Sequence, residues 1–405
     1  MLYLFVIFIG AFLLFQVQPL IAKLVLPLFG GGAAIWTACL LFFQAFLLLG
    51  YLYSHYLTKL RTLKQQATVH LVLLLISLIF LPITINNDLS FYSSLNINNS
   101  PLFEIVFLLV FSIGLPYLLL SSTGPLVQRW LSYQDSAKLP YKLYSLSNVA
   151  SLLALLSYPF IFEPLIILSN QVLLWSMGYV VFSMGFIALA LAIAKQSEQL
   201  TIDVTFAPKI KKCSAVIIFL WLALSATGVV LLVSTTNAMT QNIPPVPFLW
   251  ILPLCIYLLT FIINFHSPRW YVRWYWFVLF AISSFVAIFM YFIGSQFDII
   301  SQVVIYSVIL FSACMLCHGE LVKLKPEVEH LTLFYLNMSL GGFLGSAFIA
   351  FVAQDFFTQF LEFPIGILAV YLLFASCLTI KVNEGNKITV GEGINKILDN
   401  KTLAK

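Results

Sequence analysis

Runs of apolar residues fill most of the chain, and short polar segments separate them. Each run is close to the roughly 20 residues that an α-helix needs to cross the hydrocarbon core of a bilayer. In that solvent only a helix satisfies its backbone hydrogen bonds within one segment. The pattern therefore predicts twelve membrane-spanning helices, at residues 2–24, 35–57, 67–86, 102–121, 143–163, 171–194, 214–234, 247–265, 274–294, 298–317, 331–353 and 361–380.

The composition excludes a water-soluble protein. Hydrophobic residues make up 61% of the 405 residues and charged residues only 9%, whereas soluble domains carry about 25% charged residues. The connections between the runs are too short to hold a folded soluble domain. We therefore expect an all-α integral membrane protein, in contact with the lipid bilayer, with no nucleic-acid partner, cofactor or metal.

The basic residues predict the orientation in the membrane. All lysines and arginines except Lys23 lie in connections that follow even-numbered spans or in the C-terminal tail. Basic residues concentrate on the cytoplasmic side of membrane proteins. We therefore expect both termini to be cytoplasmic and the membrane to be a bacterial inner membrane.

The sequence contains a weak internal repeat. "SSTGPLVQ" (121–128) aligns with "LCHGELVK" (316–323), and "LYSLSNVASLL" (143–153) aligns with "FYLNMSLGGFL" (334–344). The paired positions are Gly124 with Gly319, Tyr144 with Tyr335, Asn148 with Ser339, and Trp36 with Trp250. The repeat predicts two six-helix halves of the same orientation, the plan of major-facilitator (MFS) transporters, with a ligand site between them. The expected boundaries are 1–200 and 210–381 for the halves and 382–405 for a cytoplasmic tail.

Five motifs in order carry a resemblance to a known family. They read "FQVQPLIAKLVLPLFGGGAAIWTACLLFFQAFLLLGYLYSHYL", "LSSTGPLVQRW", "LYSLSNVASLLALLSYPFIFEP", "VPFLWILPLCIYLLTFI" and "CMLCHGELVKLKPEVEHLTLFYLNMSLGGFLG". The chain resembles the membrane portion of bacterial proteins named fused MFS/spermidine synthase. The resemblance implies a soluble aminopropyltransferase-like domain in fused members, which these 405 residues do not contain, so we expect no enzyme activity from this chain. "TKLRTLKQQ" between spans 2 and 3 also departs from the major-facilitator signature.

A first polar cluster lies at the predicted outer ends of spans 1 and 7. Gln16 and Lys23 are seven residues apart and share one helix face. Ionisable residues inside a membrane usually face the protein interior; the alternative is that Lys23 snorkels to the interface. We predict that this cluster binds a small polar metabolite and that Lys23 contacts an anionic group. The candidate ligand-binding residues are Gln16, Gln18, Lys23, Trp36, Gln44, Asn148, Asn237 and Gln241.

A second polar cluster lies at the predicted inner ends of spans 4 and 10. If the repeat holds, the two polar helix ends face each other, and a histidine beside a carboxylate is suited to proton-linked gating. The alternative is that His318 and Glu320 are solvated helix-end residues. The candidate gate residues are Ser122, Thr123, Tyr144, His318, Glu320, Tyr335 and Asn337.

Three glycine or cysteine motifs have structural interpretations. "CMLCH" (314–318) matches haem-attachment spacing but falls at a cytoplasmic helix end, and "FGGGAA" (29–34) follows no strand and is a turn. Gly341 and Gly345 have the spacing of a close helix crossing.

The leading function is a secondary transporter. The alternative is a membrane anchor for a separately encoded synthase or methyltransferase.

Overall fold

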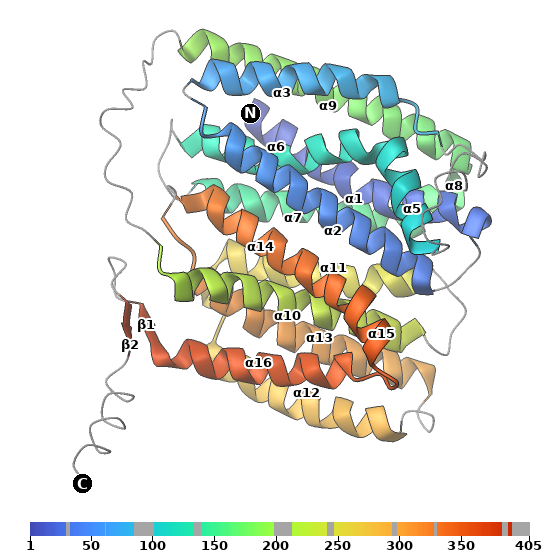
Figure 1. Cartoon of the computed structure of the whole chain (residues 1–405), viewed down its shortest axis with the longest axis vertical. Coiled ribbons are helices and arrows are strands. Elements are labelled where there is room, and N and C mark those ends of the chain that lie inside the picture. Colours follow the sequence, from blue (N-terminus) through green and yellow to red (C-terminus); the bar gives the residue numbers. More distant parts are fainter. Residues whose placement is uncertain are drawn as a thin grey trace.

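The computed structural model describes residues 1–29, 33–60, 62–84, 101–132, 139–197, 213–240, 247–293, 298–327, 330–382 and 388–390. Long helices lie side by side with their axes roughly parallel (Figure 1). Among the described residues, eleven helices are long and apolar enough to cross a membrane, and a twelfth apolar helix, Ile251–His266, is shorter. The chain is a multi-pass membrane protein, as the sequence predicts.

The first six spans are formed by α1 to α9. A π-helical turn interrupts the fourth span, and another lies near the end of the fifth span. The elements are α1 (Leu2–Phe29), α2 (Ala33–Leu57), α3 (Leu63–Ser77) with the turn η1 (Leu78–Phe80), α5 (Pro101–Leu109) with η2 (Val110–Gly114) and α6 (Leu115–Ser132), α7 (Leu139–Ser157) with η3 (Tyr158–Phe162) and α8 (Glu163–Leu165), and α9 (Leu168–Ser197).

The remaining spans are formed by α10 to α16, and a short hairpin follows them. The elements are α10 (Ala215–Thr240), α11 (Pro247–His266), η5 (Pro268–Trp270), α12 (Arg273–Ile293), α13 (Ile299–Lys323), α14 (Leu331–Ala347) with η8 (Phe348–Ala353) and α15 (Gln354–Phe356), and α16 (Glu362–Thr379). The strands β1 (Ile380–Val382) and β2 (Ile388–Val390) pair antiparallel after α16, an addition to the all-helical expectation.

The two ends of the bundle differ in charge. In Figure 1 the connections α2–α3, α11–α12 and α13–α14 lie at the same end of the bundle, together with the end of α16. We call this the basic end, because it carries the described lysines and arginines of those connections, such as Lys59, Arg273 and Lys323. Lys23 lies near the opposite end of α1. This grouping agrees with the predicted topology; which end faces the cytoplasm stays a prediction.

The fifth and eleventh spans have the same construction. Each begins as a regular helix, passes through a π-helical turn (η3 or η8) and finishes in a three-residue helix (α8 or α15). The rings of Tyr144 and Tyr335, which the sequence repeat pairs, are stacked with centroids 5.0 Å apart and planes 17° apart. The helix arrangement therefore fits two six-helix pseudo-repeats. The exact boundaries of the halves stay a prediction.

Several helices extend beyond the spans predicted from hydropathy. The fourth span continues to Ser132 and the tenth to Lys323, and the seventh ends at Thr240. His318 and Glu320 are therefore inside α13, where they are 0% and 2% exposed. The alternative that they are solvated helix-end residues is wrong, because other helices cover this part of α13.

The glycine pair of α14 lies at a close helix crossing. A Cβ atom on Gly341 would meet the backbone carbonyl oxygen of Leu222 in α10, and one on Gly345 would lie 2.6 Å from the carbonyl oxygen of Ala226. Cβ atoms do not approach other atoms that closely, so α10 and α14 pack backbone to backbone at this crossing. The packing role predicted from the sequence is confirmed.

Candidate ligand-binding cavity between the two halves

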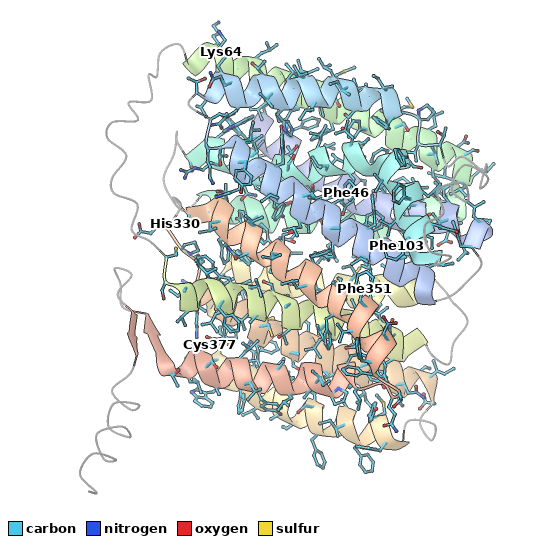
Figure 2. All side chains as sticks on the ribbon, viewed as in Figure 1. Phe46, Lys64, Phe103, His330, Phe351 and Cys377 are labelled. Carbon is cyan, nitrogen blue, oxygen red and sulfur yellow. The ribbon has the colours of Figure 1, made fainter. Side chains whose placement is uncertain are left out.

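A cavity of about 120 Å³ lies between the two halves, lined by α1, α2, α6 and α7 of the first half and by α10, α11 and α14 of the second. Figure 2 shows the described side chains on the ribbons of both halves. The volume is enough for a small polar molecule or a group of ordered waters. The polar residues on its wall are Gln18, Gln44, Tyr51, Tyr117, Ser121, Thr123, Gln128, Tyr144, Ser147, Asn148, Ser151, Ser225, Tyr257, Tyr335 and Ser339.

Three of the predicted ligand-binding residues lie on the cavity wall: Gln18, Gln44 and Asn148. The Asn148 side-chain nitrogen donates to the Tyr144 carbonyl oxygen at 2.8 Å. The Gln18 nitrogen donates to the Tyr117 hydroxyl at 3.3 Å. These bonds orient the two amides, and each amide keeps a carbonyl oxygen that can accept a further hydrogen bond.

The outer cluster predicted around Lys23 is divided in the structure. The Lys23 ammonium lies 3.1 Å from the Glu163 carboxylate, and the two side chains are 34% and 28% exposed. Glu163 belongs to the fifth span, so this ion pair connects two spans of the same half. No pattern in the sequence predicted this ion pair.

The other members of that cluster are dispersed. Gln16 is buried in α1 but does not line the cavity. Asn237 is half-buried in the last turn of α10. Gln241 lies outside the described residues, and so does the side chain of Trp36. Their proposed contact with a ligand stays a prediction.

Aromatic side chains from both halves lie on the side of the cavity nearer the basic end. Tyr144 stacks on Tyr335 across the two halves and also packs on Phe265, at a centroid distance of 4.6 Å. Beside them the His55 Nδ1 atom lies 2.9 Å from the Thr332 hydroxyl, which connects α2 to α14. We call these five residues the closing layer. Two of them, Tyr144 and Tyr335, are in the predicted gate set.

Glu320 is held within the second half. The Tyr271 hydroxyl donates to Oε1 at 2.6 Å, and Arg273 donates through Nε at 2.6 Å and through Nη2 at 2.5 Å. The Lys323 ammonium is more distant, at 3.9 Å. Bidentate arginine–carboxylate pairs are among the strongest charge-assisted contacts. Glu320 therefore fixes the start of α12 to the end of α13 and does not connect the two halves through these bonds.

Two buried histidines lie behind the cavity wall. His318 Nδ1 lies 2.8 Å from the Thr260 hydroxyl, and its ring stacks on Phe261 with centroids 3.6 Å apart. His70 lies 3.3 Å from the hydroxyl of Thr123, which lines the cavity. His70 was not among the predicted site residues, although an ionisable residue inside the third span is itself a functional signal.

The remaining predicted gate residues bond within their own helices. The Ser122 hydroxyl donates to the Leu119 carbonyl at 3.0 Å, and the Asn337 amide donates to the Leu333 carbonyl at 2.8 Å. Among the described residues, no group of three or more His, Cys, Asp or Glu side chains is placed to hold a metal ion.

Comparisons with known proteins identify the fold. No family model and no curated protein matches the sequence. A solved structure of a double tryptophan mutant of XylE is 13% identical, with a TM-score of 0.60 over 98% of both chains. The MFS proton:xylose symporter XylE bound to 6-bromo-6-deoxy-D-glucose is 12% identical, with a TM-score of 0.57 over 96% of both chains.

A bacterial homologue of the iron transporter ferroportin, in an outward-facing state, is also similar. It is 15% identical, with a TM-score of 0.59 over 93% of this chain and 98% of that one. The chain therefore has the major-facilitator fold. The spermidine-synthase part of the sequence resemblance finds no support in these comparisons.

Proposed function

We propose that this protein is a secondary transporter of a bacterial inner membrane that binds a small polar metabolite in the cavity between its halves. The cavity carries the proposal, because it has walls from both pseudo-repeats. In transporters of this plan, relative movement of the halves exposes a central site to each side in turn. Two of the solved structures with this fold are those of a proton:xylose symporter and of a bacterial homologue of an iron transporter.

In this proposal Gln18, Gln44 and Asn148 hydrogen-bond the metabolite. The closing layer is the gate at the basic end, because its stack and its His55–Thr332 bond join helices of different halves. Glu320 keeps the gate helices of the second half in place through Arg273. The membrane-anchor alternative predicts co-purification with a soluble enzyme and no ligand binding.

The test is binding and uptake of a metabolite panel that includes sugars, polyols, amino acids, nucleosides and polyamines. We expect some members to raise the melting temperature of the purified protein. Replacing Asn148 by leucine should raise the ligand concentration needed for a given shift about 5- to 30-fold, because it removes a polar group worth about 1–2 kcal/mol of binding.

The matched control is Asn264→Leu. Asn264 also donates to the carbonyl four residues before it, at 2.8 Å, but it does not line the cavity. We expect this variant to keep wild-type ligand shifts. Equal losses in both variants would contradict the placement of the binding site, and a complete absence of shifts and uptake would contradict the proposed function.

The ion pair gives a separate prediction for Lys23. If its main partner is Glu163, Lys23→Ala should leave every ligand shift unchanged. It should cost at most about 1 kcal/mol of unfolding free energy, because both side chains are partly exposed and exposed ion pairs contribute little. Glu163→Gln should behave alike. Loss of ligand binding in Lys23→Ala, but not in Glu163→Gln, would instead support the direct contact between Lys23 and a ligand.

A further inference from the structure

The wall of the cavity carries no formal charge. The residues that line it are all described by the structure, and none of them is an aspartate, glutamate, lysine, arginine or histidine. They offer hydroxyl groups, amides and aromatic rings. We propose, building on the transport function above, that the metabolite is a small uncharged molecule with several hydroxyl or amide groups, and that the cavity excludes carboxylates and amines.

Charged groups that form ion pairs among the described residues do not line the cavity. Lys23 pairs with Glu163, and Glu320 pairs with Arg273. His70 and His318 contact wall residues from behind but do not line the cavity themselves. A charged ligand would therefore enter a low-dielectric space without a counter-ion, where an unpaired charge is strongly disfavoured.

The wall has hydrogen-bonding capacity that the described protein atoms do not fill. Gln128, Ser225 and Ser339 line the cavity, and each has a buried side-chain oxygen without a hydrogen-bond partner among the described residues. Buried polar groups without partners are rare, and each one is costly. Gln128 is in the first half and the two serines are in the second, so a ligand with several hydroxyl groups can bond to both halves once these side chains turn toward it.

Aliphatic side chains and aromatic rings supply the rest of the wall. Phe43 and Tyr117 have centroids 5.1 Å apart on one side, and Tyr257 and Phe261 have centroids 5.1 Å apart on the other. All four rings line the cavity. Such faces pack well against the C–H groups of a polyol or sugar, whereas an ammonium group would gain at most a partial replacement for its lost hydration.

The experiment compares matched ligands that differ in charge. The probes are glucose, glucosamine and glucuronate; 1,4-butanediol, putrescine and succinate; and glycerol, serinol and glycerate, each tested by thermal shift on the purified full chain. For every scaffold that registers, the neutral member should bind roughly 100-fold or more tightly than its charged partners. A charged member that binds as well as its neutral partner would overturn the proposal.

An isosteric charge in the wall provides the second arm. Gln128→Glu should improve binding of the amine probes roughly tenfold or more and weaken the acid probes further. Asn148→Asp is a second variant with the same expectation, in case one of the two does not fold. Gln65→Glu makes the same change at an exposed position at the start of α3 and should leave the order of ligands unchanged.

The outcomes separate the two proposals. Shifts by charged probes with no preference for neutral ones would overturn the charge selectivity but leave the transporter proposal standing. If neither Gln128→Glu nor Asn148→Asp alters the wild-type order of ligand affinities, the binding site lies elsewhere. That result would overturn the proposal for this cavity. If neither these probes nor any member of the wider metabolite panel shifts the melting temperature or enters vesicles, both proposals fail.

Discussion

Replacing Arg273 by alanine is expected to destabilise the folded protein by about 3 kcal/mol, the cost of leaving a buried carboxylate without its counter-ion. Arg273 contacts both carboxylate oxygens of Glu320. The Glu320 side chain is 3% exposed, so water cannot replace the lost contacts. Reversible unfolding in mixed micelles measures the change in unfolding free energy.

The double variant identifies the cause. Adding Glu320→Gln to Arg273→Ala removes the buried charge itself, so we expect it to recover a large part of the loss, although Glu320→Gln alone is destabilising. Two variants in direct contact should be strongly non-additive in this way. If the losses simply add, the Arg273–Glu320 pair is not what compensates the carboxylate.

Lys323 provides the control for this pair. Its ammonium also lies near Glu320, but at 3.9 Å and with 44% of the side chain exposed. Lys323→Ala should therefore cost at most about 1 kcal/mol. An effect as large as that of Arg273→Ala would mean that charge balance over the whole site, not the bidentate contact, stabilises this end of α13.

The existence of the helices was predictable, because hydropathy is a local property of the sequence. The residues at which the helices end were not predictable from hydropathy. On a hydropathy scale Ser121 and His318 count as polar residues. The predicted fourth and tenth spans therefore end near them. In the structure Ser121 is 3% exposed and His318 is 0% exposed, covered by neighbouring helices. A polar residue buried between helices and one at a helix end have the same sequence signal, so only the tertiary structure distinguishes them.

The candidate site was predictable where the repeat constrained it. Aligning Tyr144 with Tyr335 predicts that a pseudo-twofold axis relates the two residues, and their rings are stacked in the structure. The ion pairs had no such constraint. Glu163 is 140 residues from Lys23, and Arg273 counted as a loop base in the topology, although its partner is the buried Glu320.

Substituting alanine for Gly341 or Gly345 is expected to destabilise the protein by about 2 kcal/mol each. The new methyl group would meet a backbone carbonyl of α10, at Leu222 or Ala226. Backbone atoms cannot move aside as a flexible side chain can, so the two helices must separate, and overpacking of this kind typically costs about 1–3 kcal/mol. Unfolding free energies in mixed micelles give the measurement.

Gly124 is the matched control, because it is a glycine in the interior of a long helix, as Gly341 is, but a Cβ atom there meets nothing within 4 Å. Gly124→Ala should be neutral or stabilising by up to about 1 kcal/mol, the gain from better helix propensity. A difference of about 3 kcal/mol between Gly341→Ala and Gly124→Ala would then measure the cost of the lost approach between α10 and α14. If all three variants changed stability equally, the glycines of α14 would matter only for helix propensity, and the close crossing would contribute nothing to the stability of the second half.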